Sequence, residues 1–531
     1  MAKKSLQAPV FVRDATGLVR SLSSMDAFLT GIFGMGFVFP LQYLFFAGST
    51  YQGVNLPLTV WFGLPIVLII GLTYYQLSIA FPRSGGDYVW VSRILHPAIG
   101  FMNNFVYAIV WMAFVGPVSY QFLSWGLAAM FANLGVVTGN QSYFGMVRLL
   151  SNPFIGFGVG LTFVMLATAI SLVGVKPTYK LLLVTFGLMV VVVSVYLGAL
   201  LAAGPSGFQA GFNRLSGTDY NSIIAAANKA GFSTDFTAQG AILGSVWTFF
   251  NFLGFSNSAY VAGEMKRNEK AQLWGIIGGT IIFAVVMYAI YAVSYYVMGG
   301  QWINAASLLA GSGNPAYSLP SSPVGQFLVI FANSSPIIAV LVPLGIMAGC
   351  LGGVVVTFPI ATRCVFAWSF DRVAPAKFSE VNKRGAPIYS IVLVCVVGIV
   401  FLAASFWTTF TSLLLYAIAS LWINIAIIGI AAMAFPFWRK DLFNASVPFT
   451  RKKIGGIPLV SVVGLVTFVS GAALAVMSIS PTYSGAPLNL PLLFAQALIF
   501  ALGLVIYYAS VLYRKRQGID LSTTFMEIPP E

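Results

Sequence analysis

Residues 249–264 read FFNFLGFSNSAYVAGE, and this stretch decides the fold. It lies within a segment, 241–263, that is apolar enough to span a membrane. The middle of that segment nevertheless holds Gly254, flanked by Asn251 and by the polar run 256–258. A polar break at bilayer depth is costly unless it faces protein or a water-filled cavity. Transporters use such breaks because the freed helix ends present amides and carbonyls to a substrate. We therefore expect a binding site here.

The composition is that of a membrane protein. Of the 531 residues, 59% are hydrophobic and 8% are charged, with a mean hydropathy of +0.90. A soluble globular chain carries about 25% charged residues. The formal charge of +14 invites a nucleic-acid reading, but the basic residues lie in short loops between apolar runs, which excludes that class. The three cysteines lie in or beside apolar stretches, and their spacing fits neither a metal site nor a disulfide framework.

The chain contains twelve apolar segments of spanning length. They are residues 25–47, 57–80, 99–131, 153–173, 181–203, 241–263, 272–298, 326–360, 389–405, 408–435, 457–479 and 490–513.

The basic residues set the expected orientation. If the loops alternate from a cytoplasmic N-terminus, 24 of the 27 Lys and Arg residues fall inside, and only Arg148, Arg214 and Lys229 fall outside. Positive charge favours the cytoplasmic side. We therefore predict a multi-pass plasma-membrane protein with both termini in the cytoplasm. The long connections 204–240 and 299–325 would then be extracellular, either as plain connectors or as an outer lid.

Spans 1 and 6 are the two interrupted ones, and they stand five spans apart. Span 1 contains GIFGMGF at residues 31–37, where glycines allow unwinding or close packing. Interrupted helices at matching positions of two halves indicate a transporter site. The prediction is an all-α integral membrane fold with a five-plus-five inverted repeat. Its parts are an N-terminal segment (1–24), a first repeat (25–203), the outer connection (204–240), a second repeat (241–435), two appended spans (457–513) and a C-terminal tail (514–531).

Four motifs, in order and in register, resemble those of the amino acid–polyamine–organocation (APC) transporter family. Residues 81–90, FPRSGGDYVW, resemble the signature after its second span. Gly254-Phe255 followed by AGEMK at 262–266 resembles its sixth-span pattern. RCVFA at 363–367, with DRVAP at 371–375 and GAP at 385–387, resembles the stretch after its eighth span, and GVK at 174–176 also agrees.

The resemblance implies a substrate held midway between spans 1, 3, 6 and 8. The substrate carboxylate would meet span-1 amides, and its amine would meet span-6 carbonyls, as expected at helix ends. Phe250 would cap the substrate and Tyr107 would lie near it, although ordinary packing is the alternative for each. The expected substrate-binding set is Gly31, Gly34, Met35, Gly36, Tyr107, Phe250, Asn251, Leu253, Gly254, Ser256 and Thr357.

The coupling ion stays open between Na⁺, H⁺ and none, and no other cofactor is expected. Ser256 stands where relatives often have a glutamate, and Met189 where some proton-linked relatives have a lysine. A sodium site would combine Thr357 with span-1 carbonyls. A cytoplasmic gate of charged loop residues is expected, with solvated loop charges as the alternative. The expected gate residues are Arg83, Asp87, Glu264, Lys266, Arg363 and Asp371.

These observations favour a secondary transporter of amino acids or related amines that works by alternating access. No catalytic residues are expected, since the chain has no P-loop and no paired intramembrane titratable groups. The alternatives are a polyamine, organocation or other small-metabolite exchanger of the same fold, or a channel. The expected partners are the small-molecule substrate and the lipid bilayer, without nucleic acid, for a monomer or homodimer. The largely uncharged site favours a neutral or small apolar side chain over arginine.

Overall fold

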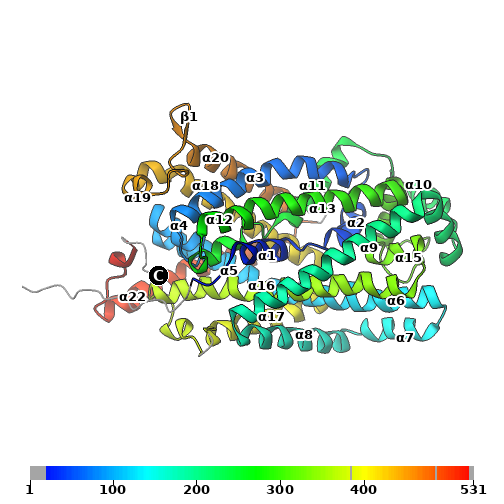
Figure 1. Ribbon diagram of the computed structural model, residues 1–531, viewed down its shortest axis with the longest axis horizontal. Helices are drawn as coiled ribbons and strands as arrows, with labels where there is room; N and C mark the ends of the chain where they lie inside the picture. The colour runs from blue at the N-terminus through cyan, green and yellow to red at the C-terminus, as the bar shows by residue number, and fades with distance from the viewer. Residues whose placement is uncertain (1–19, 383–384, 409, 485–486, 526–531) are drawn as a thin grey trace, which may run out of the picture.

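The computed structural model describes residues 20–382, 385–408, 410–484 and 487–525, and it is a bundle of long helices lying side by side (Figure 1). The predicted N-terminal segment, and the basic residues at 383 and 384, lie largely or wholly outside this range. Within it, eleven helical segments are long and apolar enough to cross a membrane. They match eleven of the twelve predicted spans. The twelfth, 241–263, is split into two short helices.

The first half of the chain is helical throughout. Its elements are α1 (Ser24–Met35), α2 (Pro40–Thr50), α3 (Leu56–Ala80), α4 (Asp87–Ile94), α5 (Pro97–Gln121), η1 (Phe122–Leu127), α6 (Ala128–Thr138), α7 (Gln141–Leu150), α8 (Pro153–Val173), α9 (Val175–Ser216) and α10 (Tyr220–Lys229).

The second half adds one short β-hairpin on the surface. Its elements are α11 (Ala238–Phe252), η2 (Asn257–Glu264), α12 (Asn268–Gln272), η3 (Leu273–Gly278), α13 (Gly279–Ser294), η4 (Tyr295–Gly299), α14 (Gly300–Gly311), α15 (Gly325–Ala332), α16 (Pro336–Phe370), η5 (Ala376–Ser379), α17 (Ile388–Trp407), α18 (Phe410–Trp438), α19 (Lys440–Ala445), β1 (Lys453–Ile454), β2 (Ile457–Pro458), α20 (Leu459–Ile479), α21 (Pro481–Ser484), α22 (Leu490–Arg516) and η6 (Leu521–Phe525).

Both predicted breaks are present, and local chemistry explains them. Helix α1 ends at Gly36, whose left-handed φ of 74° favours glycine, and α2 restarts with Pro40 in its first turn. Helix α11 ends at Phe252, and Gly254 turns the chain with a φ of 100° before η2 begins.

Burial separates the central spans from the peripheral ones. The most apolar windows of Ser24–Thr50 and Pro97–Thr138 are both 83% buried within the protein, and those of α16 and Leu414–Trp438 are 72% buried. The corresponding window of α22 is only 17% buried. An apolar helix with so little protein contact faces lipid. Spans 1, 3, 8 and 10 are therefore the central ones, and spans 1 and 8 contact η2 directly after the break in span 6.

The two long outer connections are mostly helical. Helix α9 runs on to Ser216 across a kink at Gly204, where φ is 62° and Pro205 begins a new helical turn. Helix α10 follows, and α14 occupies the start of the second connection. The polar composition predicted loops here, but polar residues are also compatible with short helices that lie outside a membrane.

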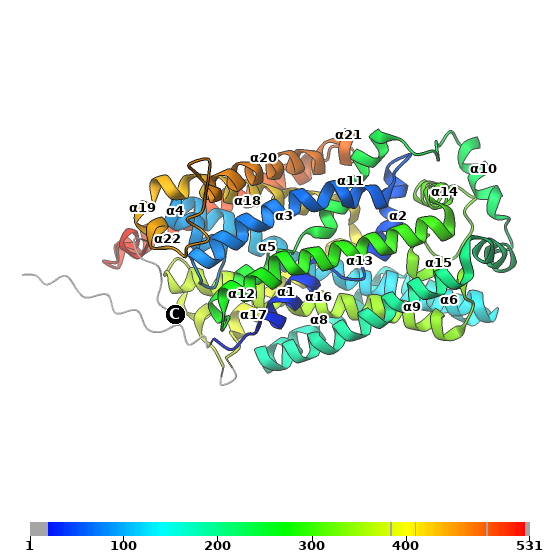
Figure 2. The same cartoon turned by 45° about the horizontal axis from the view of Figure 1, so that its top comes forward.

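Both ends of the described chain lie at the same end of the bundle, shared with α4, α12 and α19 (Figures 1 and 2). Leu22 pairs with Met265 through a backbone bridge. At the C-terminal side, Arg514 donates from its Nε to the carbonyl of Arg372 at 2.9 Å.

Candidate functional site

The two helix breaks touch each other through glycine backbones. A Cβ atom added to Gly34 would lie 2.9 Å from the carbonyl oxygen of Gly254 and closer still to the side-chain amide of Asn257. A Cβ added to Gly254 would in turn collide with the backbone of Gly34. Only glycine permits this approach. The break in span 6 and the break in span 1 therefore form one structural unit.

A cavity of about 60 Å³ lies beside this contact. Its lining is mostly aromatic and apolar, with no charged side chain, and its side-chain hydrogen-bonding groups are those of Gln121, Thr357, Tyr43 and Trp111. The lining residues are Phe33, Gly34, Met35, Phe39, Tyr43, Trp111, Phe114, Pro117, Val118, Gln121, Phe250, Leu253, Gly353, Thr357 and Leu414.

The cavity includes part of the predicted substrate set. Gly34, Met35, Phe250, Leu253 and Thr357 line it. The other predicted residues surround it at a distance or belong to packing contacts, as described next.

Gly31 packs against η3, where an added Cβ would lie 2.5 Å from the carbonyl oxygen of Gly275. Asn251 donates from its Nδ2 to the carbonyl of Trp247 and to the hydroxyl of Tyr291, at 3.2 Å each. Ser256 is buried beyond the turn. These three residues hold the helices around the site, and they do not line the cavity.

Tyr107 also lies outside the cavity lining. Its hydroxyl donates to Oδ1 of Asn257 at 2.9 Å, and its ring stacks on Tyr260 with 4.0 Å between centroids. Trp111 and Phe114 follow it at helical spacings of four and seven residues, so they share roughly its face of α5 and reach the cavity. That periodicity was available in the sequence and could have identified both residues.

Aromatic side chains separate the cavity from the end of the bundle that holds α7 and α10. Phe250 meets Tyr43 edge to face at 5.5 Å between centroids. Phe46 stacks on Trp247 at 4.9 Å and lies at the same distance from Trp125. Phe250 thus belongs to an aromatic layer that borders the cavity, and its role as a cap over the substrate stays a prediction.

The breaks leave backbone groups free. Gly36 already donates its amide to the carbonyl of Ile32 at 3.0 Å, but the amides of Phe37 and Val38 make no backbone hydrogen bond within the described residues. The carbonyls of Asn251 and Leu253 likewise accept no backbone hydrogen bond there. The sequence predicted the free amides at Gly34, Met35 and Gly36; the structure has them in the turn that follows, at Phe37 and Val38.

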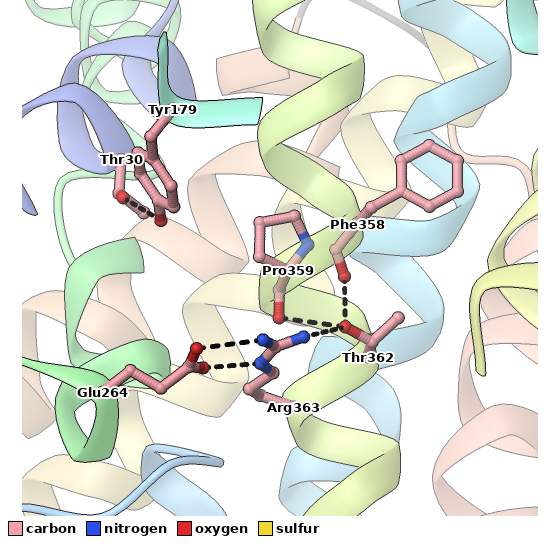
Figure 3. A network of polar contacts seen from close by, with 7 residues as sticks. All are labelled: Thr30, Tyr179, Glu264, Phe358, Pro359, Thr362 and Arg363. Carbon is pink, nitrogen blue, oxygen red and sulfur yellow. Dashed lines mark hydrogen bonds and ion pairs between the residues drawn. The ribbon is translucent and has the colours of Figure 1, made fainter. Parts of the chain in front are cut away.

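A buried ion pair ties η2 to α16 at the end of the bundle where both termini lie (Figure 3). Arg363 donates from Nε and Nη2 to the two carboxylate oxygens of Glu264, at 2.6 and 3.0 Å. Its Nη1 donates to the Thr362 hydroxyl at 3.1 Å. Nearby, the hydroxyls of Thr30 and Tyr179 are hydrogen-bonded at 2.9 Å, joining α1 to α9. Paired charges are tolerated when buried only if hydrogen bonds satisfy them.

The remaining predicted gate residues differ in the groups that they contact. Asp371 is paired with Arg93 at 2.7 Å, a partner that the sequence did not reveal, and the Arg93 guanidinium also lies over the Phe525 ring at 4.9 Å. Lys266 has an exposed side chain, and its backbone amide donates to the carbonyl of Leu22 at 3.0 Å. Arg83 donates from Nη1 to the carbonyl of Pro82 at 3.1 Å. Of the six predicted gate residues, Arg363 and Glu264 thus pair with each other, and Asp371 pairs with Arg93.

Asp87 is held by amides. Nδ2 of Asn104 donates to Oδ1 at 2.7 Å, while Nδ2 of Asn103 and of Asn424 donate to Oδ2 at 2.8 and 3.1 Å. Burial raises the pKa of Asp87 from 3.8 to about 6, although hydrogen bonds from these amides and from Tyr260 act to lower it.

Thr357 lines the cavity and donates its hydroxyl to the carbonyl of Gly353 at 2.9 Å. Its oxygen keeps lone pairs that could accept a cation. The described residues contain no cluster of three or more His, Cys, Asp or Glu side chains that could hold a metal ion. A sodium site of hydroxyl and carbonyl oxygens stays a prediction.

Comparison with known proteins shows the family to which this chain belongs. A family model described as amino acid permease matches residues 21–506. The branched-chain amino acid permease BcaP of Lactococcus lactis subsp. cremoris (strain MG1363) is 24% identical over 339 residues, which cover 62% of this chain and 64% of BcaP. An uncharacterized transporter, lpg1691, of Legionella pneumophila subsp. pneumophila (strain Philadelphia 1) is 22% identical, covering 62% of this chain and 61% of that protein. The matches thus span less than two thirds of these relatives.

Among solved structures, the crystal structure of MhsT in complex with L-phenylalanine is similar with a TM-score of 0.52 at 16% identity, covering 87% of this chain and 98% of MhsT. This likeness concerns the fold. It confirms the predicted class: an all-α membrane fold with broken spans 1 and 6.

Proposed function

The chain belongs to the amino acid permease family, and from that premise we propose that it carries amino acids across the plasma membrane by alternating access. Both termini would lie in the cytoplasm. The observation that carries the proposal is the contact between Gly34 and Gly254, which brings two pairs of helix ends to one cavity. No chemical step is required of such a protein.

The backbone groups around the cavity suit a zwitterion. The turn before α2 holds the free amides of Phe37 and Val38, next to the lining residue Phe39, and the positive end of the α2 dipole follows; both favour a carboxylate. The end of α11 offers the carbonyls of Asn251 and Leu253, which favour an ammonium group. A zwitterionic amino acid would therefore bind without a charged side chain.

The lining supports a neutral, apolar substrate side chain. Phe33, Phe39, Trp111 and Phe114 surround the cavity, and no acidic residue lines it. A polyamine needs several anionic partners along its length. An arginine side chain would bury an unpaired guanidinium. The similarity to a branched-chain amino acid permease agrees with this preference.

The proposal is tested with purified protein in proteoliposomes. Counterflow of radiolabelled leucine, phenylalanine, arginine and putrescine would be measured with and without sodium and pH gradients. We expect leucine or phenylalanine to exchange at least ten times faster than arginine or putrescine. Absence of exchange for every amino acid would contradict the proposal, and currents far above carrier rates would favour a channel. The sodium arm tests the site proposed at Thr357.

A further inference from the structure

The Asp87 carboxyl differs from the other buried carboxylates described at this end of the bundle. Glu264 and Asp371 each pair with an arginine. The groups that hydrogen-bond Asp87 are instead neutral: amides on the helices α5 and α18, and the hydroxyl of Tyr260 on η2. A carboxylate that is buried among neutral partners keeps the option of becoming neutral itself.

The groups that face Asp87 from the surrounding elements are neutral at pH 7 or already paired. The titratable ones are Tyr74 on α3, Tyr107 on α5, Tyr260 on η2 and Cys364 on α16. From α18, the polar group facing it is the amide of Asn424.

The nearby cations are already engaged. On α16, Arg363 is paired with Glu264, and at the far end of α4, Arg93 is paired with Asp371. Arg83, in the loop before α4, donates to the carbonyl of Pro82.

The cluster can satisfy both protonation states of Asp87. The carboxylate accepts from three amide groups, as described. A neutral carboxyl group would also need an acceptor for its O–H. The Oδ1 atoms of Asn103 and Asn424 are buried and have no hydrogen-bond partner within the described residues. Both side chains now direct Nδ2 at Asp87, so either would supply an acceptor for the O–H once its amide group turns over.

A continuous chain of contacts joins Asp87 to the helix breaks. Gly86, the preceding residue, lies against the ring of Tyr260, which stacks on Tyr107. The Tyr107 hydroxyl donates to Asn257, whose Nδ2 lies against Gly34 at the cavity. Packed and hydrogen-bonded groups thus connect Gly34 to the surroundings of Asp87 without a gap.

We propose that Asp87 is a proton-binding site that makes transport proton-linked: while the inner end is closed, the carboxyl binds a proton that enters from the outer side with the substrate, and it loses this proton to the cytoplasm when the inner end opens. The inference rests on the proposed transport function. The closed, dry cluster raises the pKa of the Asp87 carboxyl, and hydration on opening restores the ordinary acidity of an aspartate. The raised pKa of Asp87, about 6, places this exchange near physiological pH. The proton would reach Asp87 from the substrate cavity along the hydroxyls of Tyr107 and Tyr260, which lie between the two.

The test compares leucine or phenylalanine accumulation with and without an inward proton gradient. We expect the gradient to raise wild-type accumulation at least fivefold. In Asp87→Asn this ratio should fall to about one. Asp441→Asn is the matched control, because Asp441 is exposed, lies at the same end and pairs only with Arg439 among the described residues. It should keep the wild-type ratio.

The possible outcomes distinguish a failure of the Asp87 proposal from a failure of the proposed transport function. Wild-type counterflow without any effect of the proton gradient would overturn the role of Asp87 and leave the transport function standing. The role of Asp87 would also be overturned if the proton gradient raised accumulation in Asp87→Asn as much as in wild type. If that variant carries no substrate, proton release on adding leucine or phenylalanine to the detergent-solubilised protein decides. Release should occur in wild type and in Asp87→Glu but not in Asp87→Asn, and equal release in all three would contradict the proposal.

Discussion

The distance between the two breaks is set by single glycines. Because an added Cβ on Gly34 would lie against Gly254 and Asn257, we predict that Gly34→Ala forces span 1 away from span 6 and lowers substrate affinity more than tenfold. The check is a binding isotherm with leucine or phenylalanine. Gly187→Ala is the control: Gly187 is exposed on α9, and an added Cβ there meets nothing within 4 Å. Equal affinity in both variants would remove the glycine contact from the site.

The raised pKa of Asp87 also makes the stability of the folded protein depend on pH. An aspartate in an unfolded chain has a pKa of about 3.9, below the folded value of about 6. Between these values the folded protein binds more protons, so the free energy of unfolding falls as pH rises, by roughly 3 kcal/mol in all. Asp87→Asn should remove this loss. The melting temperature of the variant should therefore exceed that of wild type by more at pH 7.5 than at pH 4.5; a pH-independent difference would contradict this.

At the scale of elements, the Arg363–Glu264 pair holds η2 against α16. Removing one partner leaves a buried charge, which destabilises by about 3–5 kcal/mol. Glu264→Gln should therefore lower the melting temperature and loosen the inner end. Glu264→Met combined with Arg363→Met should recover part of the stability, since apolar replacement of a buried pair is often neutral.

The native cysteines allow this loosening of the inner end to be measured. Cys364 follows Arg363 directly and is buried. Cys350, which lies earlier on the same helix, is also buried. Maleimide labelling of Cys364 in Glu264→Gln, read by peptide mass spectrometry, should be at least ten times faster than in wild type. Cys350 should keep its wild-type rate. Equal acceleration of both cysteines would indicate general unfolding instead of opening at the inner end.

What the sequence could predict differs between elements. The breaks were predictable because glycine and polar residues at bilayer depth are costly unless they face protein or a binding site. It was harder to predict which residues carry the unpaired amides. They begin at Phe37, because Gly36 still completes the last turn of α1. Ion-pair partners such as Arg93 and Asp371 are 278 residues apart, and no local pattern encodes their contact. The same holds for Asn424, which reaches Asp87 from α18.

For the whole molecule, charge and shape define two different ends. The basic residues of α19, of the hairpin and of the end of α22 lie at one end, and α7 and α10 lie at the other (Figures 1 and 2). Between them, exposed apolar side chains such as Val184 and Phe494 cover the sides, where lipid replaces water as the solvent. The bundle therefore crosses the bilayer along its long axis.

The positive charge predicts the direction of crossing, since basic loops tend to stay on the cytoplasmic side. Lys453 in the hairpin and Lys229 at the end of α10 are exposed at opposite ends. The three native cysteines are buried, so a cysteine introduced at either lysine dominates labelling. In intact cells, a membrane-impermeant maleimide should label Lys229→Cys, and it should label Lys453→Cys only after the membrane is opened. The reverse pattern would place both termini outside. It would also turn the proposed proton release at Asp87 toward the exterior, so this measurement fixes the direction in which that step can drive uptake.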